Sequence, residues 1–170
     1  MRLLARLKDQ RWANLCVVIL RIMIGFAVLP AGLKKTLGQP FTDPDKVGVF
    51  HEFLHAFLAA GPMYHLVGVV QIFAAFLLMT QRFAALGAAL LLPVLVAISA
   101  LCWSSNGIPT IVVVNLMTLG TLGLLLWDFP KWQALVLDDS APRTLKVEAR
   151  SSLIEHKLWQ TCGLAIFAVY

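Results

Sequence analysis

Residues 13–33 read ANLCVVILRIMIGFAVLPAGL, and this stretch decides the fold. It is almost wholly apolar, and a helix of this length, rising about 1.5 Å per residue, crosses the roughly 30 Å hydrocarbon core of a bilayer. One full charge, Arg21, stands near its middle. Because an unpaired arginine at mid-membrane depth costs at least about 2.5–3.5 kcal/mol, we expect the rest of the chain to build a polar interior that receives it.

The composition is that of a membrane protein. Of 170 residues, 59% are hydrophobic and 14% are charged. In soluble domains about 45–50% of residues are apolar and about 25% are charged. The apolar residues come in long unbroken blocks, which predict an all-α, polytopic four-helix bundle in a lipid bilayer. The net charge is +5, and the basic residues flank the apolar blocks. This placement indicates contacts with lipid headgroups and no role in binding nucleic acid.

We expect four spans, over residues 13–33, 63–80, 83–103 and 111–129, within a membrane domain of residues 13–130. The first apolar block follows a basic start and therefore resembles a secretory leader. It is too long for the apolar core of a signal peptide. We therefore expect it to be a retained span.

The segments outside the spans are shorter or more polar. Residues 1–12 combine basic side chains with a leucine stripe, which predicts an amphipathic cytoplasmic start at headgroup level. Residues 47–60 have one apolar face at helical spacing but are too few to span, which predicts an interfacial or partly re-entrant helix. Residues 131–170 are a polar tail that ends in a short apolar segment, 158–170. This segment either docks along the bundle, lies in the interface or begins a fifth span.

The lysines and arginines are unevenly divided between the two sides of the predicted bundle. With four spans and the N-terminus inside, ten of the fourteen lie on the inner side, three lie outside and Arg21 lies in the membrane. Because basic residues gather on the cytoplasmic side, we expect both termini in the cytoplasm. The three outer residues are Lys34, Lys35 and Lys46.

Two further polar side chains stand inside the predicted spans, Gln71 in the second and Asn115 in the fourth. Together with Arg21 they form either a ligand pocket at mid-depth or a structural polar contact between helices. A ligand for such a pocket would be apolar with an anionic or carbonyl head, such as a quinone. Arg21, Gln71 and Asn115 are therefore the candidate cofactor-binding residues.

Residues 51–55 read HEFLH and match the H-E-x-x-H pattern. In that pattern two histidines one helical turn apart bind Zn²⁺, and the glutamate activates a water molecule. The third ligand of a zinc protease has no clear counterpart, and His65 is the nearest donor. His51, His55 and His65 are therefore candidate metal ligands. The alternative is the solvated polar face of an interfacial helix.

Several short motifs follow one another in a distinctive order. Residues 20–26 read LRIMIGF, residues 31–34 close the first span as AGLK, residues 61–62 end the short helix as GP, and residues 82–85 open the third span as RFAA. In this order, over about residues 13–129, the chain resembles the DoxX-like family of small four-helix membrane proteins.

The resemblance implies a four-helix bundle in the bacterial inner membrane, and it implies no single activity. Relatives are linked to thiosulfate oxidation with quinone reduction, to accessory roles beside other oxidoreductases and peptide-modifying systems, and to cargo or assembly-chaperone roles. The family often has a glutamate in the second span, where this chain has Gln71. A glutamine cannot form an ion pair with Arg21.

Four functions follow from the sequence. The favoured one is a non-catalytic accessory or structural subunit of a larger, redox-linked membrane complex, or of a homo-oligomer, because the chain has no nucleotide loop, catalytic triad or haem motif. The second is a quinone-interacting oxidoreductase subunit with a pocket at Arg21 and Gln71. The third is a metal-dependent membrane enzyme that uses residues 51–55. The fourth is a transporter, which would need an oligomer because four spans make a narrow bundle.

Overall fold

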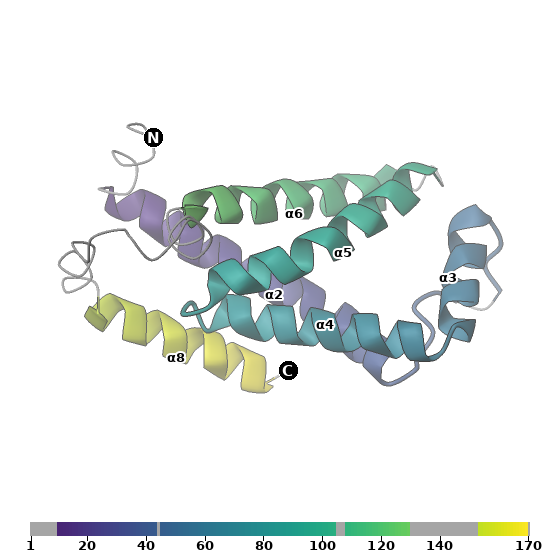
Figure 1. Ribbon diagram of the computed structural model, residues 1–170, viewed down its shortest axis with the longest axis horizontal. Helices are drawn as coiled ribbons and strands as arrows, with labels where there is room; N and C mark the ends of the chain where they lie inside the picture. The colour runs from purple at the N-terminus through teal and green to yellow at the C-terminus, as the bar shows by residue number, and fades with distance from the viewer. Residues whose placement is uncertain (1–9, 44, 105–107, 130–152, 170) are drawn as a thin grey trace, which may run out of the picture.

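The computed structural model describes residues 10–43, 45–104, 108–129 and 153–169 (Figure 1). Over these ranges the chain is all-helical, which confirms the predicted fold class. The expected amphipathic start lies outside the described residues except for its last three, and so do residues 131–152 of the polar tail. The helices are α2 (Arg11–Thr36), α3 (Val49–Ala59), α4 (Pro62–Met79), α5 (Ala84–Ser104), α6 (Ile108–Trp127) and α8 (Leu153–Val169).

Four of these helices, α2, α4, α5 and α6, are long and apolar enough to cross a membrane. The chain is therefore a multi-pass membrane protein. Each of the four begins and ends within three residues of an expected span. Local signals set some of these ends: Gly38 follows α2 at φ 68°, and Gly61, at φ 53°, precedes a proline in the first turn of α4. A positive φ is readily adopted by glycine, and proline suits the first turn of a helix.

Helices α2 and α4 pack closely and antiparallel because glycines line their contact. A Cβ atom placed on Gly25 would lie 3.2 Å from the carbonyl oxygen of Ala75, and one placed on Gly68 would lie 2.7 Å from the backbone nitrogen of Thr36. In membranes, such small residues let two helix backbones approach each other. These contacts therefore fix the register between α2 and α4.

The buried apolar core lies among all four long helices, and α5 joins it through its own glycine. A Cβ atom on Gly87 would lie 2.8 Å from the carbonyl oxygen of Ala74, so α5 is seated directly on α4. Helix α6 packs chiefly on α5 and only slightly on α2. The core consists of Ile24, Val28, Ala74, Leu78, Ala84, Ala88, Leu91, Leu95 and Leu124.

The two shorter apolar helices lie at the edge of this bundle. Figure 1 shows α3 standing across the end where α2 finishes and α4 begins, and the ring of Phe57 meets that of Tyr64 edge-on at 5.1 Å. Helix α8 runs beside α2 and α4 (Figure 1), with Gly163 against the backbone of Met79 and Phe167 edge-on to Phe76 at 5.4 Å. The terminal apolar segment thus docks along the bundle.

Candidate functional site

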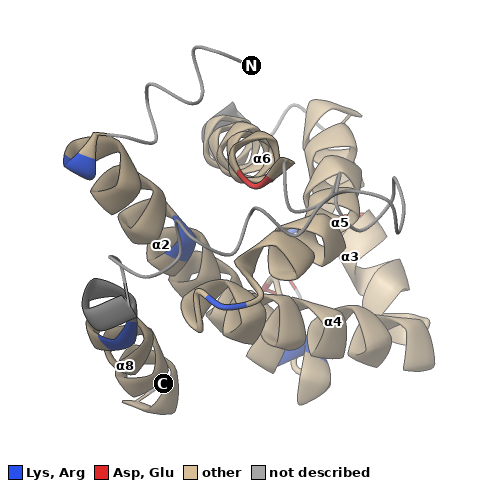
Figure 2. Cartoon of the chain, turned by 60° about the vertical axis from the view of Figure 1, so that its left-hand side comes forward, with Lys and Arg blue, Asp and Glu red and all other residues tan. Residues whose placement is uncertain are grey.

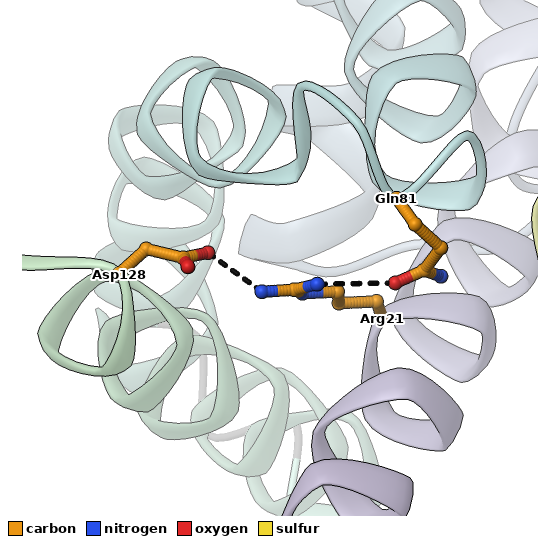
Figure 3. A network of polar contacts seen from close by, with 3 residues as sticks. All are labelled: Arg21, Gln81 and Asp128. Atoms are coloured by element: carbon orange, nitrogen blue, oxygen red, sulfur yellow. Dashed lines mark hydrogen bonds and ion pairs between the residues drawn. The ribbon is translucent and has the colours of Figure 1, made fainter. Parts of the chain in front are cut away.

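The side chain of Arg21 is enclosed by protein, with only 5% of its surface exposed. Its Nη2 donates to Oδ2 of Asp128 at 2.7 Å, and its Nη1 donates to Oε1 of Gln81 at 3.1 Å (Figure 3). Asp128 and Gln81 are buried as well. The expected shielding of the arginine is therefore present, but neither partner was assigned to it from the sequence.

The partners place this site at one end of the bundle. Gln81 lies in the turn between α4 and α5, and Asp128 directly follows α6. Figure 2 shows the acidic residue at the end of α6 and an isolated basic residue partway along α2. We expected Arg21 at mid-depth. It lies instead level with a turn and a helix end, because α2 begins ten residues before it and extends past the other helices.

Gln81 holds an unusual backbone conformation. Its φ is 60°, and it is the only non-glycine residue with positive φ in the part of the chain that the structure describes. A side chain in this left-handed region costs about 1–3 kcal/mol, which persists only where the surroundings impose it. Here the conformation turns the chain from α4 into α5 and presents the amide oxygen of Gln81 to Arg21.

The network has unused donors. Both Nε of Arg21 and Nε2 of Gln81 are buried without a hydrogen-bond partner. Buried N–H groups are normally satisfied, because leaving one unpaired costs about 1–3 kcal/mol. The arrangement can therefore receive one or two acceptor oxygens, from water or from a ligand carbonyl.

The structure does not bring Gln71 and Asn115 into this network. Gln71 is 2% exposed, and its Cβ lies 3.2 Å from the position that a Cβ on Gly32 would occupy. Gly32 is eleven residues along α2 from Arg21, which is about 16 Å of helix rise. The register of α2 against α4 therefore separates Gln71 from the arginine, and Oε1 of Gln71 has no partner.

Asn115 has partners on another helix. Its Oδ1 accepts a hydrogen bond from Oγ of Ser99 at 2.7 Å and one from Nε1 of Trp103 at 3.4 Å. Both donors belong to α5. Asn115 therefore joins α6 to α5 as interhelical polar residues do in membranes.

Of the three predicted metal ligands, His51 and His55 lie in α3 and His65 lies in α4, and no two of them share a hydrogen-bond partner. Nδ1 of His51 is hydrogen bonded to Oγ1 of Thr42, and Nδ1 of His65 to the carbonyl oxygen of Thr36 at 3.0 Å. Nε2 of His55 is buried without a partner. Among the described residues, no three His, Cys, Asp or Glu side chains are grouped so as to hold a metal ion. In this structure His51 and His65 fix the connection that follows α2.

Sequence reasoning missed Asp128 and Gln81 as site residues. A signal for the first was present, because Asp128 is the only acidic residue between Glu52 and Asp138 and stands at the exit of a span. It is thus the one carboxylate within the four expected spans. Gln81 gave no comparable signal, because a left-handed conformation at a glutamine has no sequence pattern.

Comparison with known proteins finds no matching family model, no matching curated protein and no matching solved structure. The resemblance to the DoxX-like family therefore stays an expectation based on sequence motifs, and a functional proposal must start from the geometry of this chain.

Proposed function

We propose that this chain is a DoxX-like, non-catalytic structural subunit of a larger, redox-linked membrane complex. The observation that supports this function is the pairing of Arg21 with Asp128. The single charge expected inside a span, that of Arg21, is neutralised within the chain by the carboxylate of Asp128. A charge that is neutralised in this way favours one arrangement of the helices and is less suited to carrying chemistry.

The network joins segments that are far apart in the sequence. Arg21 lies 60 residues from Gln81 and 107 from Asp128. Removing one member of a buried ion pair typically costs about 3–5 kcal/mol. The network therefore favours one arrangement of α2, the α4–α5 turn and α6, which is what a scaffold for other subunits requires.

Helix α6 offers a face for such a subunit. It is the least buried of the four long helices. A Cβ atom on Gly123 would meet nothing within 4 Å, and Leu116 is 70% exposed. The exposed residues recur in steps of four and three, as in the seam between two packed helices. This α6 seam comprises Val112, Leu116, Leu119, Gly123 and Leu126. We propose that it receives a transmembrane helix of another subunit.

Photocrosslinking in native membranes tests this function. A photoreactive residue replaces Leu119 in the α6 seam or, as the control, Val96, which is exposed on α5. We expect Leu119 to give one discrete adduct with another polypeptide and Val96 to give lipid adducts only. Lipid adducts at both positions would contradict the proposal. An adduct of twice the mass of the chain would replace the hetero-complex with a homo-oligomer.

The proposed location is the bacterial inner membrane, with both termini in the cytoplasm. Basic residues at the two ends of the bundle support this orientation. Arg11, Arg82 and Lys157 lie at the end that holds the Arg21 network, and Lys34, Lys35 and Lys46 lie at the other end. These residues are three at each end, and the excess of ten over three on the inner side comes from the basic residues of the chain start and of the tail.

A second candidate function is that of a quinone-interacting subunit, which the unused donors favour. The carbonyl oxygen of a quinone could accept from Nε of Arg21 and Nε2 of Gln81. Gln81→Met removes one donor and keeps the ion pair with Asp128. If a quinone binds here, the variant should retain less quinone than the wild-type protein after purification from the same membranes. Equal quinone content would remove this candidate.

A further inference from the structure

Helix α2 contains a second buried basic residue, Lys35, which lies fourteen residues after Arg21 and is 6% exposed. Its ammonium donates to the carbonyl oxygen of Ala31, in its own helix, at 3.3 Å. The ion pair of Arg21 with Asp128 is the only one between described residues. Of the two buried cations of α2, one therefore has a carboxylate partner and the other has none.

The burial of Lys35 is imposed by the packing of α2 on α4. A Cβ atom on Gly68 would lie 2.8 Å from Cβ of Lys35, so that α4 covers the side chain at close range. The neighbouring Lys34 is exposed. A lysine that served only to contact headgroups would extend toward water as Lys34 does.

An aromatic ring also covers the ammonium. The centroid of the Phe41 ring lies 4.7 Å from Nζ of Lys35. The residues on either side of Phe41 are anchored: Tyr64 donates its hydroxyl to the carbonyl oxygen of Gln39 at 2.8 Å, and Thr42 is hydrogen bonded to His51. The ring is thus held over the cation by contacts from α3 and α4.

This arrangement leaves the charge incompletely compensated. An ammonium has three donors, and one of them is used here. The face of a phenyl ring contributes about 0.5–2 kcal/mol, whereas an isolated charge in an apolar environment costs several kcal/mol. Lys35 is the last residue but one of α2, so this incompletely compensated cation stands at the end of the span, next to the headgroup region.

We propose that Lys35 is the cation of a binding site for an oxyanion such as phosphate, and that Phe41 covers the ammonium until the oxyanion displaces it. The oxyanion is either free in solution or the headgroup of an anionic lipid, since both present the same oxygens. This site is independent of the Arg21 network and of the proposed function.

Thermal unfolding of the full chain in nanodiscs tests the proposal, because a ligand that binds only the folded state raises its stability. One arm titrates inorganic phosphate into phosphatidylcholine nanodiscs. The other arm replaces part of the phosphatidylcholine with phosphatidylglycerol. Lys35→Met removes the cation, and Lys34→Met is the matched control one residue away.

We expect a saturable rise in the unfolding temperature of the wild-type protein and of Lys34→Met, in at least one arm. In Lys35→Met the apparent affinity should fall by about tenfold or more, the loss expected for a charge-assisted hydrogen bond of about 1.5–3 kcal/mol. Phe41→Leu keeps the lysine and removes the competing ring, and should bind about 2- to 5-fold more tightly.

The two arms separate the sources of the oxyanion. A response to phosphate identifies a free oxyanion, and a response to phosphatidylglycerol alone identifies a lipid headgroup. The proposal is overturned if neither probe gives a saturable rise, or if Lys35→Met responds as the wild-type protein does.

Discussion

At the scale of single residues, the two buried cations of α2 differ in the groups that meet them. Arg21 meets a carboxylate and an amide oxygen, whereas Lys35 meets a carbonyl oxygen and an aromatic ring. Arginine has donors in a planar fork, which suits two acceptors held on either side, and lysine is a compact charge on a flexible chain. The residue types therefore agree with a structural role for Arg21 and a ligand-binding role for Lys35.

Gln81 provides a test at this scale. Gln81→Ala and Gln81→Gly both remove the hydrogen bond to Arg21, but only glycine relieves the left-handed backbone at φ 60°. We expect Gln81→Gly to be more stable than Gln81→Ala by about 1 kcal/mol. Unfolding of both variants in the same mixed micelles measures the difference. Equal stability of the two variants would show that the backbone at this turn is not strained.

At the scale of elements, glycines set how closely the helices approach. The backbones of α2 and α4 meet at Gly25, Gly32 and Gly68, where any added carbon would contact the facing helix. Lipid tails are as apolar as leucine, so close packing and polar contacts must hold such helices together. The register that results places Gln71 opposite Gly32 and brings Lys35 beneath α4.

Replacing two glycines by alanine, one at a time, separates the effect of helix packing on stability from the effect of helix propensity. Gly68→Ala should destabilise the protein by about 1–3 kcal/mol, because its Cβ would overlap the backbone of Thr36. Gly123→Ala, which meets no atom within 4 Å, should be neutral or stabilising by up to about 1 kcal/mol. Unfolding midpoints measure both. A Gly68→Ala variant as stable as the wild-type protein would argue against the packing of α2 on α4.

At the scale of the whole molecule, the spans could be predicted from the sequence and the polar contacts could not. Long apolar runs determine where a membrane helix begins and ends, and the expected spans agree with α2, α4, α5 and α6 to within three residues. The partners of Arg21 depend on how far α2 extends past its neighbours. That offset is set by contacts between helices and leaves no periodic pattern in the sequence.

The proposed orientation gives a prediction for the whole chain. In a background with the three native cysteines replaced by serine, Lys46→Cys should react with a membrane-impermeant maleimide added to intact cells, and Arg82→Cys should react only after the cells are opened. The reason is that the two residues lie at opposite ends of the bundle, and basic residues favour the cytoplasmic side. The reverse labelling would place both termini outside.

The most direct test of the central claim is a double-mutant cycle on Arg21 and Asp128, followed by unfolding in micelles. Arg21→Met and Asp128→Leu should each cost about 3–5 kcal/mol, because each breaks a buried ion pair by removing one of its two charges. The double variant should recover most of that loss, since two apolar side chains then replace the pair. Additive losses, with the double variant less stable than either single one, would contradict the pairing of Arg21 with Asp128.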